Sequence, residues 1–195
     1  MARAKTLEDA FLETLKDVYY AEKQAVRMLQ KASKASKSQE LQAAFAQHRD
    51  ESEGQVKRLE QVFELLGKPA RSKTCEAIQG LNDEMTEVLD DFGDSPAADA
   101  VLIGAAQAVE HYEIARYGTL KTWANQLGMT EAADLLEETL QEEKHADELL
   151  TQIAESIANA EAAEGEPEDE EEEQPKQLGA RKAASKAASK SRGVA

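Results

Sequence analysis

The chain has 195 residues and a formal net charge of −16, and it is rich in Ala, Glu, Leu, Lys and Gln with only 5% aromatic residues, which favours helices. No apolar stretch approaches the roughly 18 residues that a membrane span needs, and so acidic a body repels nucleic acid over most of its surface. The single cysteine, Cys75, excludes an internal disulfide and we expect no secretory leader, so the expected compartment is the reducing cytoplasm.

The first long helix is predicted over about residues 7–34. Thr6 and Asp9 form a capping-box-like pair at its start, and its apolar residues recur at alternating spacings of three and four. Glu22 interrupts this inward stripe near the middle of the helix, where an apolar residue belongs. A carboxylate at such a position needs a partner inside the fold.

The second long helix is predicted over about residues 39–66, after an N-cap serine and before a glycine. Polar side chains interrupt its apolar stripe for two turns at the middle of the helix. His48 lies on the interrupted stripe and Glu51 flanks it. The second helix therefore places polar groups at the same depth as Glu22.

Residues 67–95 form a connection that is too long for a simple hairpin between two helices. Within it, residues 75–91 contain a short amphipathic helix, and Ser95 followed by Pro96 begins the next long helix. A long crossover lets the second and third long helices lie parallel, as in ferritin-like bundles. We therefore predict an all-α, ferritin-like antiparallel four-helix bundle with a short fifth helix in the crossover.

The last two long helices are predicted over about residues 96–127 and 131–159, joined by a tight antiparallel turn. Both carry charged residues near their midpoints, and these candidates are Glu110 and Glu113 on the first, and Glu142 and His145 on the second. Antiparallel packing brings them to the layer that already contains Glu22. The bundle is expected to end near residue 160, giving one domain over residues 1–160.

The last 35 residues have no apolar periodicity and are expected to form a disordered tail. Residues 161–175 contain nine acidic and no basic side chains, and residues 176–195 contain six basic and no acidic ones. Six cations could touch DNA or another anionic surface, but the neighbouring acidic run competes for them. We expect at most a weak nucleic-acid contact from this tail.

The polar layer predicted at the middle of the bundle, which we call its waist, has the residue types of a metal site. Burying ionised carboxylates is prohibitive unless they are paired or bind cations. Five glutamates bring five negative charges, and two divalent ions offset four of them. Residues three apart on a helix lie about 4.5 Å apart along its axis, so Glu142 and His145 can converge on one ion.

The joint pattern predicts a carboxylate-bridged pair of iron or manganese ions, with no organic cofactor. A single Glu-x-x-His pair would be a weak signal, because glutamate is common throughout this chain. The alternative interpretation is an acidic surface with a few hydrogen-bonded core residues, and His48 in particular suits either interpretation.

Four segments resemble the ferritin-like stress-protein family that includes YciE and YciF, namely YYAEKQ around Glu22, HRDESEGQ around His48, EHYEIARYGTL around Glu110 and ETLQEEKHADELL around Glu142. The resemblance spans about residues 5–158, and EHYEIARYGTL is its most specific part. It implies a cytoplasmic, dimeric, ferritin-like bundle associated with stress responses. By analogy with rubrerythrin-like bundles it also implies a ligand set, which is Glu22, Glu51, Glu110 and Glu142 with His145.

The second helix departs from the usual ligand pattern of rubrerythrin-like bundles. It offers His48 before Glu51, the reverse of the usual Glu-x-x-His order, and Gly54 stands where the usual histidine would be. His48, Glu113 or water could complete the second metal position, and the site could also be mononuclear. On the last helix, Glu143 and Asp147 are alternatives if the helix is rotated.

The leading functional hypothesis is a stress protein that binds iron or manganese and acts on dioxygen or peroxide. The alternative is a non-enzymatic dimeric scaffold that recruits partners through its acidic body and its charged tail. The sequence contains no repeated cage-forming surface, so mineral storage is not expected.

Overall fold

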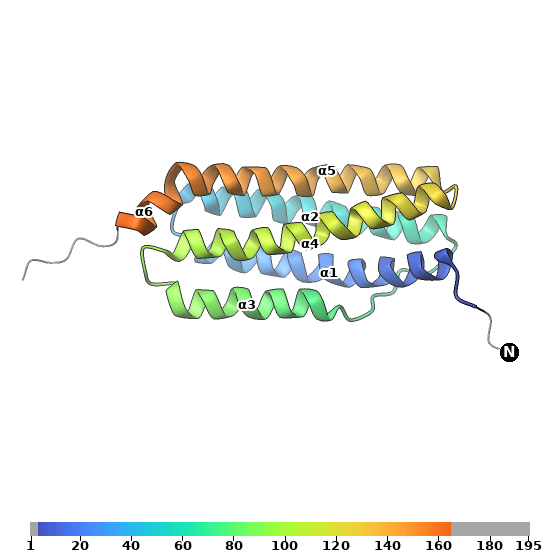
Figure 1. Cartoon of the computed structure of the whole chain (residues 1–195), viewed down its shortest axis with the longest axis horizontal. Helices are drawn as coiled ribbons and strands as arrows, with labels where there is room; N and C mark the ends of the chain where they lie inside the picture. The colour runs from blue at the N-terminus through green and yellow to red at the C-terminus, as the bar shows by residue number, and fades with distance from the viewer. Residues whose placement is uncertain (1–3, 165–195) are drawn as a thin grey trace, which may run out of the picture.

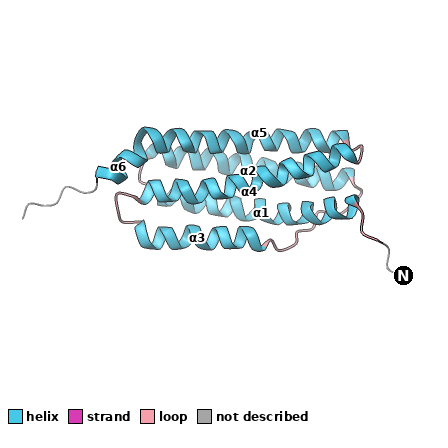
Figure 2. Cartoon of the chain, in the orientation of Figure 1, coloured by secondary structure: helices cyan, strands magenta, loops and turns pink. Residues whose placement is uncertain are grey.

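Four long helices pack into an antiparallel bundle in the order α1, α2, α5, α4 around its axis (Figure 1). Their bounds are Leu7–Ala35 for α1, Gln39–Leu65 for α2, Ala98–Gln126 for α4 and Thr130–Ile153 for α5. The computed structural model describes residues 4–164, and no strand occurs in that part of the chain (Figure 2). The predicted all-α class and ferritin-like bundle are confirmed.

The long crossover contains the predicted short helix, α3, over Glu76–Phe92. This helix packs on the outside of α4 and α1 and returns the chain to the end of the bundle where α2 began (Figure 1). As a result, α2 and α4 run in the same direction, as the length of the connection predicted.

The fourth helix begins at Ala98, two residues later than the sequence predicted. Ser95 Oγ donates a hydrogen bond to the carbonyl of Phe92 at 2.8 Å and accepts one from the N–H of Ala97 at 3.2 Å. Ser95 therefore closes a turn that precedes the helix and is not its N-cap.

The helical path continues past the predicted end of the domain at residue 160. A π-helical segment over Ala154–Ala158 follows α5, and α6 covers Asn159–Glu164. The rest of the predicted tail, residues 165–195, lies outside the described residues. Within residues 4–164, no helix combines the length and the apolar character that crossing a bilayer requires.

Local signals in the sequence account for several helix ends. Thr6 Oγ1 accepts the N–H of Asp9 at 3.3 Å, and the Asp9 carboxylate accepts the N–H of Thr6 at 2.8 Å, so the capping box is present. Gly67 and Gly128 follow α2 and α4 with φ values of 62° and 73°. Glycine adopts this left-handed conformation without steric cost, which ends both helices sharply.

The apolar core consists of two clusters at opposite ends of the bundle. One contains Leu41, Leu102 and Leu150, and the other contains Phe11 and Leu59. Between them lies a layer of buried polar side chains, which are Glu22, His48, Ser52, Gln55, Glu110, Glu113, Thr139 and Glu143. The waist of the bundle is therefore polar and screened from solvent at both ends.

Asp99 at the start of α4 ties that helix to the start of α2. Its carboxylate is buried and accepts the backbone N–H groups of Lys37 and Ser38, each at 2.8 Å. A carboxylate here complements both the unpaired donors and the positive end of the α2 dipole.

Replacing Asp99 with Asn should lower the free energy of unfolding by about 2 kcal/mol, because the amide cannot accept both N–H groups and leaves one buried donor unpaired. Urea denaturation measures this difference. The matched control is Asp50→Asn, since the Asp50 side chain is 68% exposed and should change stability by less than about 0.5 kcal/mol. Equal unfolding midpoints for the two variants would contradict this account of the α2 start.

Candidate metal centre

Five buried side chains from all four long helices meet at the waist of the bundle. They are Glu22 of α1, His48 of α2, Glu110 and Glu113 of α4, and Glu143 of α5, and none is more than 6% exposed. They form two groups whose ligand atoms lie within 4.8 Å of one another: His48 with Glu110 and Glu143, and Glu22 with Glu113 and Glu143. Glu143 belongs to both groups and lies at the centre of the cluster.

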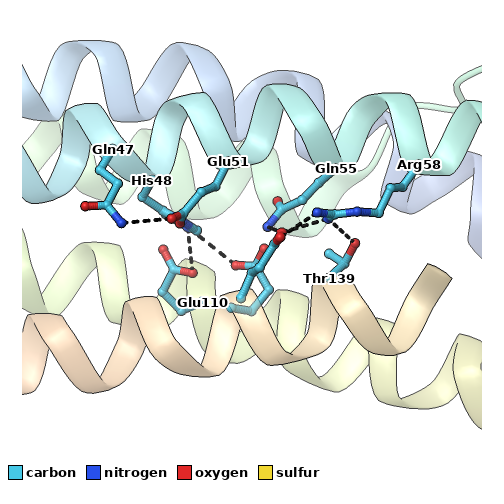
Figure 3. A network of polar contacts seen from close by, with 9 residues as sticks. Gln47, His48, Glu51, Gln55, Arg58, Glu110 and Thr139 are labelled. Atoms are coloured by element: carbon cyan, nitrogen blue, oxygen red, sulfur yellow. Dashed lines mark hydrogen bonds and ion pairs between the residues drawn. The ribbon is translucent and has the colours of Figure 1, made fainter. Parts of the chain in front are cut away.

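Hydrogen bonds fix one side of the cluster and leave other oxygens without partners. Tyr117 donates its hydroxyl hydrogen to Glu22 Oε1 at 2.5 Å, and His48 Nε2 lies 3.1 Å from Glu110 Oε2 (Figure 3). Glu22 Oε2, Glu113 Oε1 and both oxygens of Glu143 are buried without a hydrogen-bond partner, although Glu143 Oε2 lies 3.5 Å from His48 Nε2. Unpaired buried carboxylate oxygens are costly, so these four atoms require a proton or a cation.

Burial is the main cause of the perturbed acidity of these carboxylates. It raises the pKa of Glu22 and of Glu113 well above the usual value, and the charge of Glu143 adds to the effect on both. Burial also raises the pKa of Glu110 to about 8, although His48 opposes this shift. Without a cation, the cluster therefore holds protons on carboxylates at neutral pH.

His48 connects the buried cluster to the edge of the bundle. Its burial disfavours the charged imidazolium, but Glu110 and the hydrogen bonds to its neighbours outweigh that effect and raise the pKa of His48. On the outer side, His48 Nδ1 lies 3.3 Å from Glu51 Oε2, and this hydrogen bond lowers the pKa of Glu51. The two ring nitrogens thus face different environments, Nε2 the cluster and Nδ1 the partly exposed Glu51.

The residues present fit a pair of divalent cations. Four carboxylates carry four negative charges when ionised, which two divalent ions neutralise, while the imidazole adds a neutral nitrogen donor. Carboxylate oxygens with one imidazole suit iron and manganese, and the shared Glu143 is the residue able to bridge two ions. The unpartnered oxygens of Glu22, Glu113 and Glu143 are available as ligand atoms.

Four of the seven ligands predicted from the sequence lie in the cluster, namely Glu22, His48, Glu110 and Glu113. Glu51 lies at its edge against His48, and its side chain is 30% exposed. Glu142 points away from the cluster and binds Arg58, while His145 is exposed.

The rotation of α5 explains why Glu143 replaces Glu142 in the interior. The sequence predicts an inward stripe of Leu135, Thr139, Glu142, Ala146, Leu149 and Ile153. The structure buries Thr139, Ala146 and Ile153 as predicted, but Leu136, Glu143 and Leu150 take the place of the residues that precede them. Leucine occupies both sets of positions, so periodicity alone does not distinguish them. Asp147, the other alternative on this helix, lies at the surface, where it contacts His111 at 3.2 Å and Gln107 at 3.0 Å.

A narrow depression between α2 and α5 lies directly outside His48. Its walls are mostly apolar, with Phe45 and Leu149 among them, and both Glu51 and His145 line it. The interior of the depression has room for about one water-sized molecule. Small neutral molecules such as dioxygen or hydrogen peroxide are of that size, whereas larger solutes are excluded.

The sequence and the fold are similar to those of known proteins. The family model "Domain of unknown function (DUF892)" matches residues 6–163. Protein YciF of Escherichia coli (strain K12) is 49% identical over 152 residues, covering 77% of this chain and 91% of that protein. The crystal structure of the E. coli stress protein YciF aligns with a TM-score of 0.76 and 46% identity over 80% of this chain and 99% of that chain. YcfI from Rhodopseudomonas palustris gives a TM-score of 0.76 and 40% identity over 79% and 99%.

The stability of the metal-free protein should fall as the pH rises. Glu110 keeps its proton up to a pKa of about 8 in the folded chain, against an ordinary value of 4.5. Its stabilising contribution is therefore complete below about pH 4.5 and is lost as the pH rises through 8, with a slope of about 1.4 kcal/mol per unit for each proton. Urea denaturation in the presence of a chelator should show a loss of about 2–3 kcal/mol between about pH 6 and pH 8.

The pKa values of Glu22, Glu113 and His48 are also raised, so these groups, like Glu110, make the folded protein less stable as the pH rises. Glu110→Gln should make the pH profile of stability flatter, because the amide does not titrate. Glu148→Gln on the exposed face of α5 should leave the profile unchanged. A flat profile in the unmodified protein would contradict the proton-holding cluster.

Proposed function

The chain belongs to the DUF892 family of YciF-type proteins, and on this premise we propose that it is a ferritin-like stress protein whose waist binds two divalent iron or manganese ions and acts on peroxide or dioxygen. The E. coli relative YciF is described as a stress protein, and the proposed role during stress rests on that similarity. The proposal for the metal centre rests on the cluster itself.

The observation that carries the proposal is the position of Glu143. Its side chain is fully buried, its Oε1 has no hydrogen-bond partner, its Oε2 lies 3.5 Å from His48 Nε2 without forming a hydrogen bond, and it lies within both groups of candidate ligands. A structural carboxylate in an apolar core is normally paired with a cation or with several donors. Because Glu143 belongs to both groups, it would contribute to holding both cations, and its charge would be compensated by them.

Neighbouring side chains hold the candidate ligands in place. The Tyr117 hydroxyl orients Glu22, and Glu51 accepts from His48 Nδ1, which fixes the tautomer that leaves Nε2 free to bind a cation. Glu51, a predicted ligand, therefore supports the proposal as an outer residue that positions His48. The apolar clusters at both ends exclude water from the waist and strengthen the electrostatic interactions within it.

Bound ferrous ions would supply redox chemistry that the side chains lack, namely the two electrons that the reduction of hydrogen peroxide and two protons to two water molecules requires. The depression outside His48 offers a route for a molecule of that size.

Three expectations from the sequence stay predictions. The described residues belong to one chain, so the expected homodimer is untested by them, and the expected cytoplasmic location is likewise untested. The weak nucleic-acid contact assigned to the basic tail falls on residues 176–195, which lie outside the described part of the chain.

Loading the full chain with Fe²⁺ under anaerobic conditions, or with Mn²⁺, should raise its melting temperature, because a cation that binds only the folded state stabilises it. Glu143→Gln should abolish most of this increase and reduce the stoichiometry below two ions. Glu148→Gln, an exposed substitution on the same helix, should retain both. Thermal denaturation with elemental analysis measures the two quantities.

The same variants separate an enzyme from a scaffold. The iron-loaded unmodified protein and Glu148→Gln should consume hydrogen peroxide, whereas Glu143→Gln should consume it at least about tenfold more slowly. If the unmodified protein neither binds nor is stabilised by either metal, the metal centre is refuted and the non-enzymatic scaffold is the remaining interpretation.

A further inference from the structure

Gln55 is a fully buried polar residue of α2 that the metal centre described above does not use. It lies on the inward stripe that also contains His48, Ser52 and Leu59, all of them buried. The amide oxygen of Gln55, Oε1, has no hydrogen-bond partner. A buried amide carbonyl without a partner costs about 1–3 kcal/mol, so its presence at the waist requires a physical explanation.

The orientation of the Gln55 amide is determined by a network around Glu142 (Figure 3). Gln55 Nε2 donates to Glu142 Oε2 at 3.1 Å, and Arg58 binds both oxygens of the same carboxylate at 2.7 and 2.5 Å. Arg58 is held in turn by Thr139 Oγ1 at 3.0 Å and by Glu138 at 2.9 Å. Because an ionised carboxylate only accepts hydrogen bonds, the amide nitrogen must face Glu142 and the oxygen must face away from it.

The register of the helices places Gln55 beside the second group of ligands. Gln55 binds Glu142, which directly precedes Glu143 in α5, so Gln55 lies at about the same depth along the bundle axis as Glu143. On the other side, Tyr19 donates to Glu60 at 2.8 Å, and since α1 and α2 are antiparallel, this contact sets Glu22 opposite the turn of α2 that contains Gln55. His48 lies two turns away and belongs to the first group.

The two groups of candidate ligands differ in one respect. The group of His48, Glu110 and Glu143 contains a neutral nitrogen donor, whereas Glu22, Glu113 and Glu143 offer carboxylates only. A neutral oxygen donor beside Glu22, Glu113 and Glu143 would give the second group a neutral ligand, as His48 does for the first. It would add no charge to a cluster in which four carboxylates already neutralise two divalent ions. Gln55 Oε1 has the required chemistry, burial and depth.

We propose that Gln55 Oε1 is a ligand of the second cation, together with Glu22, Glu113 and Glu143, and that the Arg58–Glu142 ion pair holds the amide in the binding orientation. This inference rests on the metal centre proposed above. It assigns Glu142, which the sequence predicted as a ligand, to positioning Gln55. An amide oxygen at the second position suits Mn²⁺, the ion used in the test below.

The experiment is a titration of the metal-free full chain with Mn²⁺, in which the free aqueous ion is counted by electron paramagnetic resonance. Gln55→Met removes the oxygen and keeps a side chain of similar length, Gln55→Glu keeps an oxygen donor, and Gln61→Met is the matched control at an exposed glutamine of the same helix. We expect two ions in the unmodified protein. Gln55→Met should weaken the second by at least about tenfold and leave the first unchanged.

The other two variants and the stability of the metal-free forms complete the test. Gln55→Glu should retain two ions, and Gln61→Met should bind both within about threefold of the unmodified protein. Metal-free Gln55→Met should be folded and at least as stable as the unmodified protein, because it removes an unpaired buried oxygen. Two ions bound by Gln55→Met with unchanged affinities would overturn this inference alone, whereas no Mn²⁺ binding by the unmodified protein would overturn the metal centre and this inference with it.

Discussion

The structure depends on how the negative charges of four buried carboxylates are neutralised inside an otherwise apolar bundle. Glu22, Glu110, Glu113 and Glu143 come from three helices and are almost completely buried, with one histidine as the only basic side chain among them. Removing ionised carboxylates from water without compensation costs far more than the net stability of a domain of this size. Either protons or cations must therefore enter the waist whenever the bundle folds.

The polar layer also determines how the helices align. The two apolar clusters on either side hold the helices together by non-directional aliphatic and aromatic packing. The bonds from Tyr117 to Glu22 and from Arg58 to Glu142 add directional contacts, because each needs its partner at hydrogen-bond distance. The same residues that make the waist chemically distinct thus set the register of α1, α2, α4 and α5, so ligand geometry and fold are linked.

Much of the fold was predictable because the helical signals are local. Caps at Thr6 and Ser38, glycines after α2 and α4, and the three-four spacing of apolar residues defined the long helices to within a few residues at most ends. The depth of the site was also predictable, since Glu22 and Glu110 interrupt stripes that are otherwise apolar.

The rotation of one helix and the role of two polar side chains were not predictable from the sequence. On α5, adjacent acidic residues and paired leucines make two rotations equally amphipathic, and only packing against α2 and α4 selects Glu143 for the interior. Gln55 belongs to the polar interruption that the sequence predicted in the stripe of α2, but its bond to Glu142 and its unpartnered oxygen depend on how α2 and α5 pack. The role of Arg58 was not predictable either, because its partner Glu142 lies 84 positions away in the sequence.

The most direct test of the central claim is an anomalous-difference map from crystals of the full chain grown with Mn²⁺. The account predicts two peaks at the waist, one among His48, Glu110 and Glu143 and the other among Glu22, Glu113 and Glu143, with Glu143 adjacent to both. A map without peaks there, in which the carboxyl groups are instead paired with one another as neutral acids, would contradict it.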